Sequence, residues 1–237
     1  MQANEAAWYD EFYQQVQGSW APWYKFSLPH LRTILTPQTK LVELGCGQGH
    51  ALRYLAHEKL LPEENIYGTD QSRTAVDFVK RCLPKAHLDT GDIYQLGYPS
   101  NFFQVCLLME TIEHLEDPAS ALKQIHSVVA PDGFLFVSFP NFLSLPWLVV
   151  RLLGDWLNKP NWLVRQPIDK IYTVFHVIKI VKAAGFEFNR GIGSGYGPPI
   201  LYRYEKNWMT GGLNALGLWW LSFHPILVFR KPHRTDS

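Results

Sequence analysis

The fold of this chain is decided by the stretch Lys40-Leu41-Val42-Glu43-Leu44-Gly45-Cys46-Gly47-Gln48-Gly49. An apolar run that ends in alternating glycines predicts a short buried strand followed by a tight turn. The glycines let the backbone approach a ligand closely, because they carry no Cβ atom. A helix to about Leu61 is expected next, since Leu52, Leu55 and Ala56 recur at helical spacing.

The same alternation of short apolar runs and helical patterns continues to about residue 139, and closing elements follow from residue 173 onward. Further strands are expected over residues 65–70, 87–88, 105–109, 134–139, 186–188 and 226–229. The helices between them are expected over residues 72–82, 119–130 and 173–184. This order predicts an α/β fold, a Rossmann-like, doubly wound and mostly parallel sheet of seven strands.

The 237 residues are expected to form one domain, 1–237. Residues 1–36 are rich in aromatic side chains and predict a helical cover. Residues 38–140 hold the alternating core, where a cofactor would bind. Residues 141–171 break the pattern with several Pro and Trp and predict an insertion that acts as a lid after the fifth strand. Residues 172–237 supply the closing helix and strands, with an aromatic segment on the substrate side.

Charge is balanced overall but uneven along the chain. The formal net charge is +1, so the chain lacks the strongly positive electrostatic field of a general nucleic-acid binder. Residues 1–141 carry 10 Lys and Arg against 16 Asp and Glu, whereas residues 142–237 carry 12 against 5. We therefore expect no nucleic-acid partner, and a small-molecule substrate that is apolar, with or without an anionic group. The oligomeric state is left open.

Compartment is indicated by the cysteines and the apolar segments. Cys46, Cys82 and Cys106 fit neither a zinc spacing nor a disulfide framework, so a reducing, cytoplasmic location is expected. The most apolar window, residues 213–229, is interrupted by Asn214 and Pro225 and does not predict a membrane-spanning helix. Peripheral contact with a membrane surface stays open.

Polar residues follow several of the predicted strands. Glu43 and Gly45 mark the first strand end, Asp70 the second, Asp92 the third, and Met109 with Glu110 the fourth. In a doubly wound sheet these carboxyl ends lie along one rim, where ligands bind. The convergence of four such ends predicts the binding site.

The glycine loop indicates which kind of ligand binds there. A dinucleotide fingerprint needs its third glycine where this chain has His50, and the Gly-Lys-Ser/Thr of a phosphate loop is absent. The loop therefore suits a nucleoside without a pyrophosphate. Asp70 is placed to accept hydrogen bonds from two ribose hydroxyls, and Asp92 can accept one from an adenine amine.

The strand ends extend into four segments: Val42-Glu43-Leu44-Gly45-Cys46-Gly47-Gln48-Gly49, Asp70, Gly91-Asp92 and Met109-Glu110-Thr111-Ile112-Glu113-His114-Leu115-Glu116-Asp117-Pro118. Together they resemble the class I S-adenosylmethionine-dependent methyltransferases. The resemblance covers about residues 38–140. In addition, Lys182-Ala183-Ala184-Gly185-Phe186 is similar to the family's later helix and strand.

The resemblance implies that S-adenosyl-L-methionine is the cofactor. The glycine loop would pass along the methionine part, with Glu43 beside the amino group and Tyr13 in reach of the carboxylate. Ile93 would join Asp92 at the adenine, and Met109 would border the sulfonium through its backbone. The implied cofactor-binding residues are Tyr13, Glu43, Gly45, Cys46, Gly47, Gly49, Asp70, Gln71, Asp92, Ile93 and Met109.

The segment Glu110-x-x-Glu113-His114 resembles a narrower set, the ubiquinone O-methyltransferases and the small-RNA 2′-O-methyltransferases. In these, two carboxylates and an imidazole can hold a divalent cation, a ligand set that suits Mg²⁺, Mn²⁺ or Zn²⁺. The RNA enzymes add a later His that residues 167–172 lack. We therefore expect no metal, and we name His114 and Glu110 as the candidate catalytic bases.

The sequence thus predicts a methyltransferase that acts on a small acceptor, with O-methylation favoured. A quinone, phenol, polyketide or lipid-linked sugar would each suit the aromatic and basic second part of the chain. Two alternatives stay open at this point. The chain could bind the cofactor as a non-catalytic partner of another enzyme, or it could be an RNA 2′-O-methyltransferase.

Overall fold

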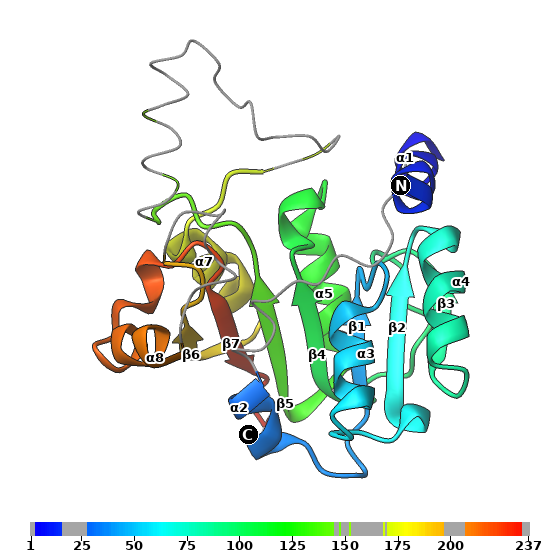
Figure 1. The fold of residues 1–237 in the computed structure, drawn as a ribbon, viewed down its shortest axis with the longest axis horizontal. Coiled ribbons are helices and arrows are strands. Elements are labelled where there is room, and N and C mark those ends of the chain that lie inside the picture. Colours follow the sequence, from blue (N-terminus) through cyan, green and yellow to red (C-terminus); the bar gives the residue numbers. More distant parts are fainter. Residues whose placement is uncertain are drawn as a thin grey trace.

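The structure is a computed structural model that describes residues 3–15, 28–144, 147, 152, 168, 170–196 and 207–233. Its centre is a seven-stranded sheet in the order β3-β2-β1-β4-β5-β7-β6 (Figure 1). The strands are β1 (Leu41–Leu44), β2 (Ile66–Asp70), β3 (His87–Thr90), β4 (Phe103–Met109), β5 (Val129–Ser138), β6 (Glu187–Ile192) and β7 (Ile226–Arg230). β1 to β5 pair in parallel, whereas β7 runs antiparallel to both β5 and β6. The predicted fold class is confirmed.

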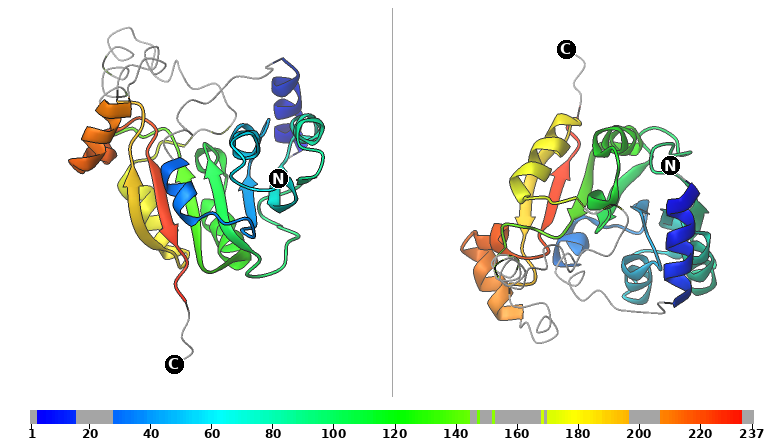
Figure 2. Two further views of the ribbon diagram at one scale, coloured as in Figure 1. Left: turned by 60° about the horizontal axis from the view of Figure 1, so that its bottom comes forward. Right: turned by 90° about the horizontal axis from the view of Figure 1, so that it is seen from above.

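Helices lie on both faces of the sheet (Figure 2). The α-helices are α1 (Ala3–Gln15), α2 (Leu28–Ile34), α3 (His50–His57), α4 (Arg73–Cys82), α5 (Pro118–Val128), α7 (Val174–Ala183) and α8 (Asn207–Ala215). Short 3₁₀ helices are η2 (Glu63–Asn65), η3 (Ile112–His114) and η5 (Leu218–Leu221). Side-chain caps begin three of the helices, with Ser72 before α4, Asp117 before α5 and Thr173 before α7.

Side chains of the central strands alternate between two apolar cores. In β4, Val105 and Leu107 pack with α2, α3 and α4, whereas Cys106 and Leu108 pack with α5 and α7. All four residues of β1 are buried. A strand that is apolar on both faces is what an internal parallel strand requires. This two-sided burial fixes the register of the sheet, and with it the rim on which the polar strand ends meet.

Several boundaries differ from those expected. α3 ends at His57 rather than near Leu61, and β5 begins at Val129, so that the expected turn at residues 131–133 lies within the strand. Asp132 accommodates that turn with φ +63. The aromatic stretch before β7, to which the sequence assigned no element, contains α8 and η5.

The predicted lid, residues 141–171, lies outside the described residues except at 141–144, 147, 152, 168, 170 and 171. Where it is described, Trp147 stacks on Phe142 with ring centroids 4.4 Å apart, and it lies 5.6 Å from Phe223. The start of the insertion therefore packs beside the approach to β7. Within the described ranges, no helix is long and apolar enough to cross a membrane.

Candidate functional site

A cleft is lined by residues at the carboxyl ends of β1, β2 and β4 and by residues of α1. α1 lies beyond the carboxyl end of β2 (Figure 1). The cleft encloses about 1030 Å³ of free space, its open mouth included. The strand ends contribute Gly45, Asp70 and Glu110, whereas α1 contributes the aromatic side chains of Phe12 and Tyr13. The predicted rim is therefore a single cleft, polar on the sheet side and aromatic on the helix side.

The glycine loop after β1 has a backbone that other residues tolerate poorly. Gly45 and Gly47 adopt φ +72 and +48, in the left-handed region. A Cβ atom on Gly47 would lie 2.5 Å from the Tyr13 hydroxyl oxygen, and one on Gly45 would lie 2.6 Å from the Thr111 side chain. The loop thus presents bare backbone beneath Tyr13. Cys46 is buried away from the cleft lining, and burial raises the pKa of its thiol.

Asp70 ties the glycine loop to the second strand end. Its Oδ2 accepts a hydrogen bond from the Gly47 N–H at 2.7 Å, and its Oδ1 accepts one from the Ser72 N–H at 2.8 Å. Burial raises the pKa of Asp70, and these backbone hydrogen bonds oppose that rise. Each carboxylate oxygen can accept a further hydrogen bond, so Asp70 could also accept from hydroxyl groups in the cleft that it lines. Gln71, the next residue, lines the cleft as well.

α1 is fixed to the core by a carboxylate at the start of α4. Asp10 Oδ1 accepts hydrogen bonds from the Ser72 hydroxyl at 2.5 Å and from the Thr74 N–H at 2.9 Å. Asp10 therefore caps α4 from another helix, where the helix dipole favours negative charge. One turn further along α1, Tyr13 lies over Gly47, and burial raises the pKa of its hydroxyl. The position of Tyr13 depends on this contact between α1 and α4.

Glu43 lies behind the glycine loop and is 2% exposed. Its Oε2 is buried without a hydrogen-bond partner in the described part of the chain. Burial, and secondly the negative charge of Asp70, raise the pKa of Glu43 to about 8. A buried carboxylate oxygen that lacks a donor is suited to a cationic amino group, although Glu43 itself does not line the cleft.

The raised pKa of Glu43 predicts a specific pH dependence of folding. Because the folded-state pKa of about 8 exceeds the ordinary 4.5, the folded protein holds this proton more tightly than the unfolded chain. Its contribution to stability is complete at low pH and is lost as pH rises from about 4.5 to 8. The Glu43→Gln variant, which stays neutral, should lose less stability over that range, by about 1.4 kcal/mol for each unit of pKa difference. Urea unfolding at pH 5 and pH 8 measures this, and parallel losses in the two proteins would contradict it.

The side of the cleft near β3 differs from the sequence-based expectation. Gly91, Ile93 and Tyr94 line the cleft, but Asp92 does not. The Asp92 carboxylate instead accepts a hydrogen bond from the Tyr94 N–H at 2.9 Å. An Asp that bonds the amide two residues on is a turn-forming residue. In this structure, Ile93 is thus better placed than Asp92 to contact a ligand.

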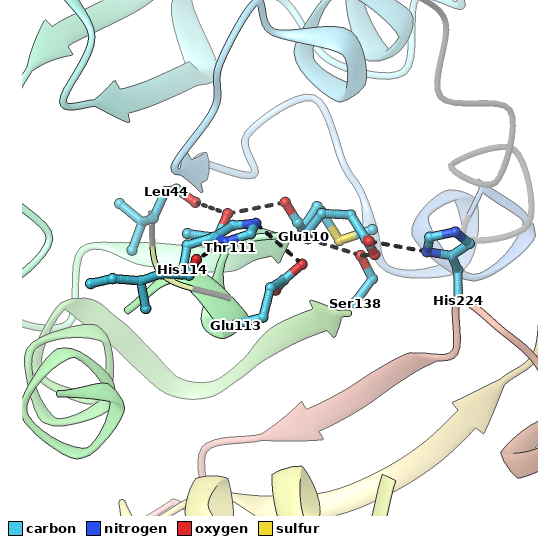
Figure 3. Close-up of polar contacts among 9 residues, drawn as sticks. Leu44, Glu110, Thr111, Glu113, His114, Ser138 and His224 are labelled. Atoms are coloured by element: carbon cyan, nitrogen blue, oxygen red, sulfur yellow. Dashed lines mark hydrogen bonds and ion pairs between the residues drawn. The ribbon is translucent and has the colours of Figure 1, made fainter. Parts of the chain in front are cut away.

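Met109 and Thr111 close the fourth strand end. The Met109 side chain is buried and does not line the cleft. Its carbonyl oxygen accepts a hydrogen bond from the Thr111 hydroxyl at 3.0 Å, and that hydroxyl also lies 3.4 Å from the Leu44 carbonyl oxygen. Thr111 thus joins the ends of β1 and β4 at the floor of the cleft (Figure 3).

Glu110 is held by residues from two other strand ends (Figure 3). Its Oε1 accepts a hydrogen bond from the Ser138 hydroxyl at 2.7 Å, at the end of β5. Its Oε2 lies 3.0 Å from Nδ1 of His224, just before β7. Glu110 also lines the cleft. The Glu110 carboxylate is therefore oriented by Ser138 and His224 and is also accessible to a ligand in the cleft.

His114 is oriented by a backbone carbonyl. Its Nδ1 lies 2.7 Å from the carbonyl oxygen of Ile168, and since a carbonyl can only accept, Nδ1 carries the proton. The other nitrogen, Nε2, lies 3.6 Å from Oε1 of Glu113. His114 lines the cleft, so both candidate catalytic residues reach it. Across the described residues, no group of three His, Cys, Asp or Glu side chains is arranged to hold a metal ion.

Several cleft residues were absent from the prediction. Tyr9 and Phe12 were detectable, because with Tyr13 they recur at spacings of three and four along α1. Thr69 and Tyr94 each neighbour a predicted strand-end residue. His224, which lies beside the cleft, is marked by no local sequence pattern, because it is 114 positions from the carboxylate it contacts.

Comparison with known proteins agrees with this geometry. A family profile described as a methyltransferase domain matches residues 42–137. An uncharacterized methyltransferase of Schizosaccharomyces pombe is 26% identical over 116 residues, which cover 44% of this chain and 41% of that protein. The chain thus spans less than half of that relative's length.

Two other relatives cover more of the chain. A ubiquinone biosynthesis O-methyltransferase of Thiobacillus denitrificans is 25% identical over 175 residues, covering 71% of this chain and 73% of that protein. A chain from the Haloferax volcanii complex between the Trm112 methyltransferase activator and the putative methyltransferase matches the fold, with a TM-score of 0.66 and 15% identity. That match covers 98% of this chain and 100% of the other. Residues 42–137 thus match a methyltransferase domain, and the strand order is that of the class I S-adenosylmethionine-dependent methyltransferase fold.

Proposed function

We propose that this chain binds S-adenosyl-L-methionine in the cleft and transfers its methyl group to a hydroxyl of a small, apolar acceptor. The observation that carries the proposal is that the bare glycine loop and Asp70 share one cleft with Glu110 and His114. The first pair suits a nucleoside-containing cofactor. The second pair can take a proton from an acceptor. A single cleft thus offers both halves of a methyl transfer.

The residues present fit the cofactor. The glycine loop leaves space that a Cβ atom would fill, and the amino group would bind on the side of this loop behind which the unpartnered Oε2 of Glu43 lies. Asp70 would accept hydrogen bonds from the ribose hydroxyls, beside Gln71. Ile93 would pack against the adenine. Tyr13 would close the methionine end from α1, as its place over Gly47 supports.

The protein's own contribution is binding, orientation and proton transfer. The bound cofactor supplies a methyl group already activated by its sulfonium charge, so the chain needs to align the acceptor and exclude water. Phe12 and Tyr13 form the aromatic wall of the cleft on the α1 side and would limit the access of water to the bound cofactor. Glu110 and His114 can each accept the hydroxyl proton, since both line the cleft and both are oriented by hydrogen bonds.

The acceptor side is proposed from the second part of the chain. Residues 142–237 are aromatic and carry an excess of basic over acidic residues, 12 against 5. Such a composition suits an acceptor with an apolar ring or chain that carries a phosphate or carboxylate. The Thiobacillus relative, a ubiquinone biosynthesis O-methyltransferase, makes a prenylated phenol or quinol the first class to test. A lipid-linked acceptor would also bring the chain to the cytoplasmic surface of a membrane.

The test combines the purified chain with methyl-labelled cofactor and separate acceptors, followed by mass spectrometry of the products. The panel contains a prenyl-substituted catechol, a polyketide phenol, a lipid-linked sugar and a small RNA duplex. We expect label on an oxygen of the catechol or the phenol, without an added protein partner. Chelation by EDTA should leave most of the activity, as no metal is proposed. Label on RNA alone, or turnover only with a second protein, would overturn the proposal.

A further inference from the structure

The backbone of Glu110 is held in an uncommon conformation at the end of β4. Its φ is +50, in the left-handed region that a non-glycine residue seldom adopts. Its N–H donates to Ser138, with the carbonyl oxygen at 3.0 Å and the hydroxyl oxygen at 3.1 Å. Strain of this kind clusters at functional sites. The fold therefore constrains the direction in which the Glu110 side chain leaves the strand.

The Glu110 carboxylate is then fixed at both of its oxygens. The Ser138 hydroxyl donates to Oε1 at 2.7 Å, and His224 Nδ1 lies 3.0 Å from Oε2. The Glu110 side chain retains 19% exposure, whereas that of His224 retains 8%. The imidazole thus lies behind the carboxylate, on the side away from the cleft, and orients it without reaching the cleft lining.

The backbone of His224 is in turn held by Ser194, which lies two residues after the end of β6. Its N–H donates to the Ser194 carbonyl oxygen at 3.0 Å, and its own carbonyl oxygen accepts from the Ser194 hydroxyl at 2.6 Å. β7 begins two residues later at Ile226. His114, by contrast, is oriented through Ile168, which lies in the insertion. Of the two candidate bases, Glu110 is the one oriented by the sheet itself.

We propose that Glu110 accepts the acceptor's proton and that His224 is the positioning residue that keeps its carboxylate directed into the cleft. This rests on the proposed methyl transfer. As the acceptor oxygen bonds to the methyl carbon, the electron pair of the broken carbon–sulfur bond stays on sulfur. The hydroxyl proton passes to Glu110, and water takes it up afterwards. His224 donates through Nδ1 throughout and exchanges no proton in the step.

The first test needs no turnover. In the full chain labelled with ¹⁵N-histidine, imidazole shifts report which ring nitrogen carries a proton, and the His224 signal is assigned by its absence in His224→Asn. We expect Nδ1 of His224 to be protonated, because it faces a carboxylate. A neutral ring protonated only at Nε2 would overturn the proposal, because Nδ1 could not then donate to Glu110. This result stands whether or not the proposed function is correct.

The second test uses kinetics with labelled S-adenosylmethionine and the prenyl-substituted catechol. His224→Leu should lower kcat roughly tenfold to a hundredfold, the scale of a disturbed general base, with the acceptor KM and the cofactor Kd changed less than about twofold. His224→Asn should restore most of kcat, because its amide nitrogen stands at the same position along the side chain as Nδ1. Ser222→Ala, a buried neighbour, serves as the control and should keep kcat unchanged.

Two results would overturn the positioning role. Equal losses in His224→Leu and His224→Asn, with a matching fall in melting temperature, would make His224 structural. If His224→Leu instead raises the acceptor KM and leaves kcat unchanged, His224 is a residue that binds the acceptor. Absence of methylation by the unaltered chain would refute the proposed function alone, and the imidazole shifts would then decide the role of His224.

Discussion

Replacing Asp70 by alanine should abolish measurable binding of S-adenosylmethionine and destabilise the protein. The carboxylate accepts hydrogen bonds from the Gly47 and Ser72 amides, and it is 7% exposed. A buried N–H left without an acceptor costs about 1 to 3 kcal/mol, so removal of both acceptors should lower the melting temperature. Loss of the proposed ribose contacts should weaken cofactor binding by at least roughly a hundredfold, or about 3 kcal/mol.

The two effects of Asp70→Ala can be separated by calorimetry at a temperature where the variant stays folded. Asp77→Asn is the matched control, because it removes the same charge from the exposed side of α4, where Asp77 pairs with Arg73. The control should bind the cofactor as the unaltered chain does. Unchanged affinity in folded Asp70→Ala would show that Asp70 only braces the glycine loop.

The Gly47→Ala variant should lose both stability and cofactor affinity. At φ +48 an alanine is strained by roughly 1 to 2 kcal/mol. Its Cβ would also lie 2.5 Å from the Tyr13 hydroxyl oxygen, so that Tyr13 and α1 must shift. Because Tyr13 closes the proposed methionine end, we expect affinity to fall more than tenfold, about 1.4 kcal/mol. Urea unfolding and calorimetry measure the two losses.

A second substitution separates backbone strain from the collision. In Tyr13→Phe the hydroxyl is absent, so adding Gly47→Ala to that variant should cost less affinity than adding it to the unaltered chain. Gly97→Ala is the control, because a Cβ atom there meets nothing within 4 Å. If the cost of Gly47→Ala is the same in both backgrounds, the strained loop alone is responsible, and Tyr13 has no part in it.

The core of the fold was predictable because its signals are local. The apolar run at residues 41–44 and the glycines that follow specify a buried strand and a turn over ten residues. Ser72, Asp117 and Thr173 cap their helices within three residues of their own positions. Where the local signals conflicted, the boundaries were wrong. Pro131 and Gly133 indicated a turn, but β5 begins before it, because Val129 already pairs with Phe103 of β4 and the ladders with β4 and β7 continue from Phe134.

The rim of the cleft was predictable for a topological reason. Parallel strands place their carboxyl ends on one edge, so residues marked at separate strand ends in the sequence meet in space. Gly45, Asp70 and Glu110 line one cleft, as this rule requires. The rule predicts where the backbone of each strand end lies, but it does not predict the direction of each side chain. Asp92 stands at a strand end, yet its carboxylate turns to the Tyr94 amide.

The sequence by itself therefore determined the alternation of strands and helices, the glycine loop and the polar rim, since each depends on spacing within a few residues or on parallel pairing. Only the tertiary structure decided which distant groups orient that rim. Asp10 caps α4 across 62 positions, and His224 reaches Glu110 across 114. These contacts arise because α1 packs on α4 and because β7 inserts antiparallel beside β5. No local pattern of charge or periodicity predicts such a pairing, because the contact stabilises the protein only after the distant segments have packed together.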